Sequence, residues 1–214
     1  GGIVGGDTLD ISVRLDAKSH ALITMPGASK FYRSSGPLAC LSQHFYLDEE
    51  ATLEWLPQDT IIFPGANAAL RSVFHLHATS TLLAWELYCL GRPVINETFS
   101  HGTLENRLEV WVDGEPRLIE RLHLSGGDLT PVADHPWVGT LLFYPAREAL
   151  LDAVRALLAP LENVGGATLT DDLLSVRFLS HDNLICQRVM RDIWQSLRPL
   201  LTSKTACSPR IWQT

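Results

Sequence analysis

Histidines and glutamates are the side chains of this sequence whose types and spacing could do chemistry. His75 and His77 are two residues apart in a strand-like segment, so both rings would lie on one face and could share a metal ion. The alternative is that they are two polar positions on an otherwise apolar strand. We favour that alternative, because a closed metal site needs three or four ligands. The sequence offers no further ligands at a recognisable spacing from this pair. The other histidines are scattered at expected turns and strand ends: His20, His44, His101, His123, His135 and His181.

Three carboxylates lie within apolar runs, and Glu86 is the most deeply embedded of them, in the segment Leu82–Leu90. A carboxylate there is costly to bury unless it is paired, hydrogen-bonded or facing water. Arg92, two residues after this segment, is a candidate partner. For Glu54 and Glu120 we expect side chains that point outward from a half-exposed sheet. Carboxylates that line a wet internal passage would bind a divalent cation weakly and transiently.

The elements that must position these residues are predicted to be strands as far as Tyr144. Polar and apolar residues alternate through Thr8–Leu15, which is typical of a strand with one buried face. Asp113-Gly114 predicts a tight hairpin turn, because such a turn needs positive φ angles. The predicted strands are Thr8–Leu15, Ala21–Met25, Leu38–Leu47, Ala51–Leu56, Thr60–Phe63, Leu70–Ala78, Leu82–Leu90, Leu104–Val112, Pro116–Leu124 and Thr140–Tyr144.

The last third of the chain changes character, and two helices are predicted there. The first spans Pro145–Ala159, with its proline in the first turn, where a missing N–H does no harm. A strand at Leu173–Leu179 follows. The second helix spans Asn183–Leu197, with Asp182 as its N-cap and the next proline as its stop. Because no repeat or linker interrupts the chain, we expect one domain over residues 1–214, mainly β within a β-rich α+β class.

Composition excludes several classes of protein. The 214 residues are 46% hydrophobic and 19% charged, as in globular proteins, and the net charge of −7 comes without any cluster of cations for nucleic acid. No run approaches the roughly 20 apolar residues of a membrane helix. The four cysteines are far apart and form no C-x-x-C motif, so reduced thiols in the cytosol are expected.

An enzyme is modestly disfavoured, because no G-x-S-x-G, H-E-x-x-H or Walker lysine motif is present. A hydrolase or lyase that uses scattered Asp, Glu and His residues in a β-rich cleft stays as the alternative reading. The segment Pro26–Arg33 combines a turn, two cations and two adjacent aromatic residues. This mixture suits a partner surface, whereas a phosphate-binding loop would contain more glycine.

A series of ordered motifs resembles one known family over nearly the whole chain. The motif Leu53–Ala66 is the most recognisable of them. The set is Gly5–Leu9, Pro26–Ser34, Leu53–Ala66, Trp85–Glu86, Leu90–Pro93, Glu97–Phe99, Arg107–Val110, Asp113–Gly114, Glu120–Leu122 and Pro209–Thr214. Together they resemble the urease accessory proteins of the UreD type, also called UreH. The abrupt glycine-rich start lacks the N-terminal portion of that family, so a fragment is expected.

The resemblance implies an elongated stack of β-sheets with a few helices, in the cytosol, without a reaction or a tightly bound cofactor of its own. It implies binding to a UreF-type accessory protein, through it to the UreG-type GTPase, and to the urease apoprotein, with a homodimer in that complex as a further option. Nickel would pass through an internal passage. By position in the motifs, Asp7, Glu86 and Glu120 are the predicted nickel-passage residues, and Lys30 and Arg33 belong to the passage or to a partner surface. His75 and His77 match no motif.

Overall fold

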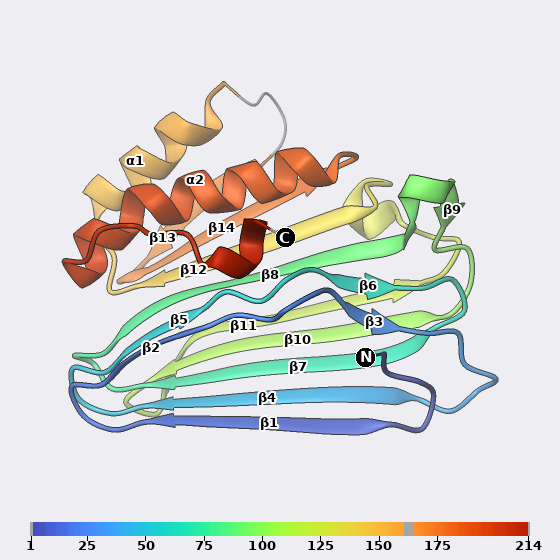
Figure 1. Ribbon diagram of the computed structural model, residues 1–214, viewed down its shortest axis with the longest axis horizontal. Coiled ribbons are helices and arrows are strands. Elements are labelled where there is room, and N and C mark those ends of the chain that lie inside the picture. Colours follow the sequence, from blue (N-terminus) through green and yellow to red (C-terminus); the bar gives the residue numbers. More distant parts are fainter. Residues whose placement is uncertain (1, 161–164, 214) are drawn as a thin grey trace.

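Two stacked β-sheets form the body of the protein (Figure 1). The computed structural model describes residues 2–160 and 165–213. One sheet contains, in spatial order, β1 (Thr8–Leu15), β4 (Ala39–Leu47), β7 (Asn67–Leu76), β10 (Thr103–Val112) and β11 (Glu115–Ser125). The other contains, in order, β13 (Gly165–Thr170), β14 (Leu173–Ser180), β12 (Trp137–Tyr144), β8 (Thr81–Arg92), β5 (Thr52–Trp55) and β2 (His20–Ile23), with β3 (Ser29–Phe31), β6 (Thr60–Ile62) and β9 (Glu97–Thr98) off this path.

The chain winds between the two sheets in a solenoid-like manner, because most neighbouring strands are parallel. β1, β4, β7 and β10 pair in parallel in one sheet, and β2, β5 and β8 do so in the other. The register aligns Phe45 with Phe74 and Phe74 with Val110, and the two phenyl rings stack with centroids 4.6 Å apart. In-register rows of this kind bury a continuous apolar surface between the sheets. The predicted class, a mainly β stack of sheets with two helices late in the chain, is confirmed.

Two helices cover the outer face of the second sheet (Figure 1). They are α1 (Glu148–Leu158) and α2 (Asn183–Thr202), and the residues of β8 alternate between them and the interior. Trp85 and Leu87 belong to the same apolar cluster as Ile193 of α2, whereas Leu82 and Ala84 belong to a cluster shared with the other sheet. Asp182 caps α2 as predicted, since its Oδ1 accepts a hydrogen bond of 2.7 Å from Leu184 N. None of the described helices is long and apolar enough to cross a membrane.

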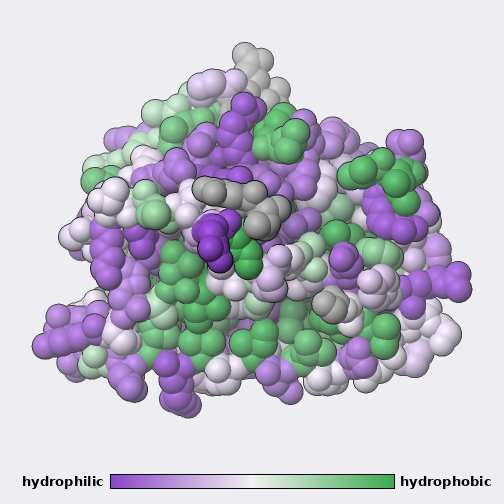
Figure 2. Space-filling model, viewed as in Figure 1, coloured by the Kyte–Doolittle hydropathy of each residue, from purple (hydrophilic) through white to green (hydrophobic). Residues whose placement is uncertain are grey.

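The edge formed by β1, β2 and β3 is the more apolar part of the face seen in Figure 2. Figure 2 shows hydrophobic residues at the surface over this part of the stack, whereas hydrophilic residues prevail over the helices. Leu9 of β1 is 40% exposed, and Val4 and Tyr32 are also exposed. The described residues also form three short 3₁₀ segments, which are η1 (Pro93–Ile95), η2 (Thr130–Val132) and η3 (Arg210–Gln213).

The hairpin predicted at Asp113-Gly114 is confirmed and joins β10 to β11 in antiparallel pairing. Both turn residues have positive φ, 49° and 84°. That conformation matches the twist of the two strands, and a glycine in the second position adopts it without steric cost. β11 is thereby folded back onto the edge of the parallel rows.

The structure differs from the sequence prediction at four elements. Pro199 does not end the second helix, which continues to Thr202, because a proline in the last turn removes only one ladder hydrogen bond. Pro145 lies before the first helix, which begins at Glu148. The short strand β3 lies where a turn was expected, and β13 was missed altogether. β3 has three residues, too few to show alternation, and β13 begins with two glycines.

The expectation that Glu54 points outward was also wrong, because its side chain is fully buried at the contact between β5 and α2. Arg198 donates to both carboxylate oxygens at 2.8–3.1 Å, Trp194 Nε1 donates at 2.8 Å, and His20 Nε2 lies at 2.7 Å. Burial alone would raise the pKa of Glu54, but these hydrogen bonds outweigh burial and lower it. This ion pair fixes α2 on the sheet.

Replacing Arg198 by alanine tests this attachment. It would leave the Glu54 carboxylate buried without its counter-charge, so the free energy of unfolding should fall by about 3–5 kcal/mol. Urea denaturation of both proteins measures the change. The matched control is Arg188→Ala on the exposed side of the same helix, expected within about 0.5 kcal/mol of wild type. Equal stability of the two variants would contradict the structural role of the ion pair.

Candidate functional site

A cavity of about 600 Å³ lies between the two sheets. β8, β12 and β14 form one wall, β10 and β11 form the other, and η2 lies at one end. Its lining is mixed, with apolar side chains around a few polar ones. The lining residues are Tyr88, Asn106, Leu108, Glu120, Arg121, Leu122, Pro131, Val132, Val138, Gly139, Thr140, Gly165, Arg177, Phe178 and Leu179.

Glu86 lies beside this cavity and divides the apolar interior in two. Its neighbours on the same face of β8 are Ala84, which belongs to one apolar cluster, and Tyr88, which belongs to another. Opposite it, Gln43 of β4 pairs with Ser72 of β7, whereas the inward pairs on either side along the same two strands are leucines and phenylalanines. Gln43, Ser72 and Asn106 of β10 form, with Glu86, a hydrogen-bonded polar layer in the core.

Uncharged groups hold the Glu86 carboxylate. Ser72 Oγ donates to Oε1 at 2.5 Å, Tyr88 OH donates to Oε2 at 2.7 Å, and Asn106 Nδ2 donates at 3.5 Å. Burial raises the pKa of Glu86, and the charge of Glu120 raises it further, while the three hydrogen bonds oppose the shift. Burial and the Glu86 carboxylate also raise the pKa of Tyr88. Arg92, the partner expected from sequence, instead binds Glu97, with Nε to Oε2 at 2.7 Å.

Glu120 lies at the rim of the same cavity and forms an ion pair with Arg177 across the two sheets. The two side chains are 33% and 42% exposed, so water reaches the pair. The structure thus brings together two of the three predicted passage carboxylates. Glu86 is at depth, and Glu120 is near solvent.

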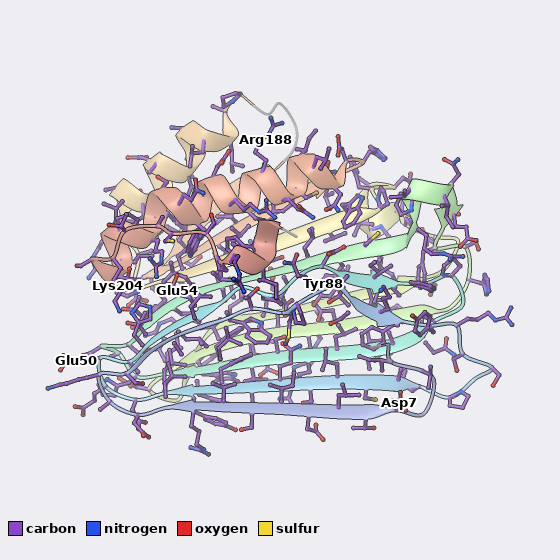
Figure 3. The ribbon with its side chains drawn as sticks, in the orientation of Figure 1. Asp7, Glu50, Glu54, Tyr88, Arg188 and Lys204 are labelled. Atoms are coloured by element: carbon purple, nitrogen blue, oxygen red, sulfur yellow. The ribbon has the colours of Figure 1, made fainter. Side chains whose placement is uncertain are left out.

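The other predicted site residues lie elsewhere. Asp7 precedes β1, and its Oδ2 accepts a hydrogen bond of 2.9 Å from Val4 N. Asp7 lies far from Tyr88, which lines the cavity (Figure 3). Lys30 is on β3, where its charge opposes the rise that burial causes in the pKa of Asp59. Arg33 lines a separate hollow with residues that include Phe63, Arg92 and His101.

The histidine pair that spacing suggested does not form a metal site in the described chain. His75 stacks on Tyr46, with ring centroids 4.8 Å apart, and burial lowers its pKa. His77 lies beyond the end of β7, and its Nδ1 is 2.9 Å from Thr79 Oγ1. Among residues 2–160 and 165–213, no three His, Cys, Asp or Glu side chains are grouped closely enough to hold a metal ion.

The partners of Glu86 were missed by sequence reasoning, although one left a signal. Tyr88 is two residues further along β8 and therefore must share its face. Ser72 and Asn106 come from β7 and β10, and only the register of the sheets shows that they meet the carboxylate. Chemically, the site offers carboxylate, phenol and amide oxygens in a partly apolar cavity. Oxygen donors of this kind suit a divalent cation that is held loosely.

Fold and cavity together define a class of protein: a β-solenoid-like scaffold with a carboxylate-lined cavity between its layers. A model of the UreD urease accessory protein family matches residues 1–213. A urease accessory protein UreD of Enterobacter sp. (strain 638) is 75% identical over 214 residues, which are all of this chain and 78% of the relative. Those of Klebsiella aerogenes and Pseudomonas putida (strain GB-1) are 69% and 51% identical over the whole chain, covering 79% and 77% of each relative.

The chain belongs to the UreD urease accessory protein family. This confirms the family predicted from the motifs, and with it a non-catalytic scaffold that takes part in urease maturation. The hydrolase or lyase alternative is set aside. The role of each site residue remains a prediction.

The raised pKa of Glu86 has a consequence for stability that can be measured. Because the folded-state pKa lies above the unfolded one, the contribution of Glu86 to stability is fully present at low pH and is lost as the pH rises through the folded pKa. Glu86→Gln removes this loss. Its free energy of unfolding relative to wild type should therefore increase between pH 4 and about pH 8. Urea denaturation across that pH range measures the difference in the free energy of unfolding. The control is Glu105→Gln, which changes an exposed side chain of β10. A difference that shrinks with rising pH would contradict the burial of an ionisable Glu86.

Proposed function

We propose that this protein conducts nickel ions through the interlayer cavity as part of a urease maturation complex in the cytoplasm. Its partners would be a UreF-type accessory protein, through it a UreG-type GTPase, and the urease apoprotein that receives the metal. Nickel is cargo in this proposal and not a resident cofactor. The single observation that supports it is the Glu86 carboxylate, held between the sheets by uncharged donors beside a cavity.

The contrast between two buried glutamates supports a cation-binding role for Glu86. Glu54 is neutralised by the Arg198 guanidinium, whereas the hydrogen bonds to Glu86 within the described chain come from a hydroxyl, a phenol and an amide. An ionised Glu86 therefore keeps an uncompensated negative charge that a divalent cation can neutralise. Without the cation, the raised pKa favours the protonated form, so metal arrival and proton release are coupled. Competition between the proton and the cation for the Glu86 carboxylate weakens cation binding. Weak binding suits a site that passes nickel on.

Glu120 would act at the rim of the cavity. A cation that enters there would compete with Arg177 for its carboxylate, so the ion pair would oppose tight capture near solvent. Asp7 stays a predicted passage residue that lies outside this cavity. Lys30 and Arg33 are proposed for a partner surface, because they too lie outside it. The homodimer in the complex remains a prediction.

Glu86→Gln tests the passage, since it keeps the size and polarity of the side chain but removes its charge. Urease activity in cells that express the urease genes with this variant should fall roughly tenfold or more. Glu105→Gln, on the exposed surface of β10, is the matched control and should activate normally. Pull-down of the UreF-type partner measures assembly, and we expect it to be unchanged for both variants.

Two results would contradict the proposal. Full activation with Glu86→Gln would show that nickel does not depend on this carboxylate. Loss of partner binding, with the thermal melt unchanged, would show that the residue supports assembly and not metal transfer.

A further inference from the structure

Two histidines that are far apart in the sequence stack on each other at one end of the molecule. His135 lies between η2 and β12, and His181 lies between β14 and α2. Their ring centroids are 4.3 Å apart, with 30° between the ring planes. The antiparallel register of β12 and β14 explains the meeting, because it pairs Trp137 with Ser180 and so brings the residues just outside both strands together.

The pair lies next to the interlayer cavity. His135 Nδ1 is 3.3 Å from the carbonyl oxygen of Val132, and Val132 lines the cavity. Leu179, which also lines it, is two residues before His181. In Figure 1 the start of α2 lies beside the yellow loop that contains η2, at the end of β12 opposite α1. The two imidazoles are therefore at the same end of the cavity as η2.

The contact with Val132 determines which nitrogen of His135 is free. A carbonyl oxygen can only accept, so Nδ1 is the protonated nitrogen and Nε2 keeps its lone pair. Histidines that bind metals are commonly fixed in this way, by donating the other ring N–H to a backbone carbonyl. His181 is exposed, so its ring can turn toward an ion at His135.

We propose that His135 and His181 form a two-imidazole site for a divalent transition-metal ion at the η2 end of the cavity. Imidazole suits nickel, copper and zinc, and the identification with nickel rests on the proposed function. The nearby Asp182 uses its carboxylate to cap α2, at 2.7 Å from Leu184 N. Water would fill the remaining coordination positions, so the ion would be held loosely enough to move on.

The test uses the purified protein with Ni²⁺ alone, in competition with a chromophoric chelator. The double variant His135→Ala/His181→Ala should bind nickel about tenfold more weakly or worse. The matched control is His77→Ala/His123→Ala, which removes two imidazoles from separate surface positions and should bind like wild type. Paramagnetic shifts of imidazole protons in the wild type, absent from the first variant, would identify the ligands. Unchanged nickel affinity in that variant, or equal loss in both variants, would overturn the proposal.

Folding is checked by thermal melts. His135 is half-buried, and its replacement could lower the melting temperature. In that case the single variant His181→Ala, at an exposed position, tests the proposal, with the same expected loss of nickel affinity.

The two proposals fail separately. If Glu86→Gln blocks urease activation but the histidine variant binds nickel normally, the passage stands and the imidazole site is overturned. If the histidine variant loses nickel while Glu86→Gln activates urease fully, the imidazole site stands without the passage.

Discussion

The in-register parallel pairing of β4, β7 and β10 is the constraint on which the rest of the structure depends. It places equivalent residues in rows, so each inward position is repeated across three strands, as in the row through Phe45, Phe74 and Val110. An apolar row then packs against the facing sheet, whereas a polar row must find hydrogen-bond partners there. Gln43 and Ser72 are paired in one such row, and Ser72 finds its hydrogen-bond partner in Glu86 on β8. Both the cavity and its carboxylate follow from this register.

The two buried glutamates show how context decides the role of one residue type. Glu54 and Glu86 both lie on strands of the same sheet, but they face opposite sides of it. Glu54 meets a helix that supplies Arg198, and its pKa is lowered, so it stays ionised and joins helix to sheet. Glu86 meets a sheet that supplies hydroxyl and amide groups, and its pKa is raised. The first arrangement stabilises the fold, and the second leaves the ionised form of Glu86 without a counter-charge, as its proposed role needs.

Sequence patterns predicted the strands well, because alternation and turn residues such as Asp113-Gly114 are local signals. They also singled out Glu86, since a carboxylate in an apolar run is visible without a structure. What they could not supply was the register, and every partner of Glu86 except Tyr88 depends on it. The orientation of Glu54 was wrong for the same reason, because Arg198 is 144 residues away along the chain. His135 and His181 looked scattered until the pairing of β12 with β14 joined them.

The polar layer around Glu86 is costly to the fold, and this cost argues for a function. Burying a carboxylate without a counter-charge carries a desolvation cost, and the raised pKa of Glu86 shows that its three uncharged donors offset this cost only in part. The internal ion pair of Glu54 does not carry this cost to the same degree, because Arg198 neutralises the carboxylate. A cavity of about 600 Å³ beside the charge removes packing contacts as well. Stability alone therefore explains neither feature, whereas both would serve the proposed passage of a hydrated cation between the sheets.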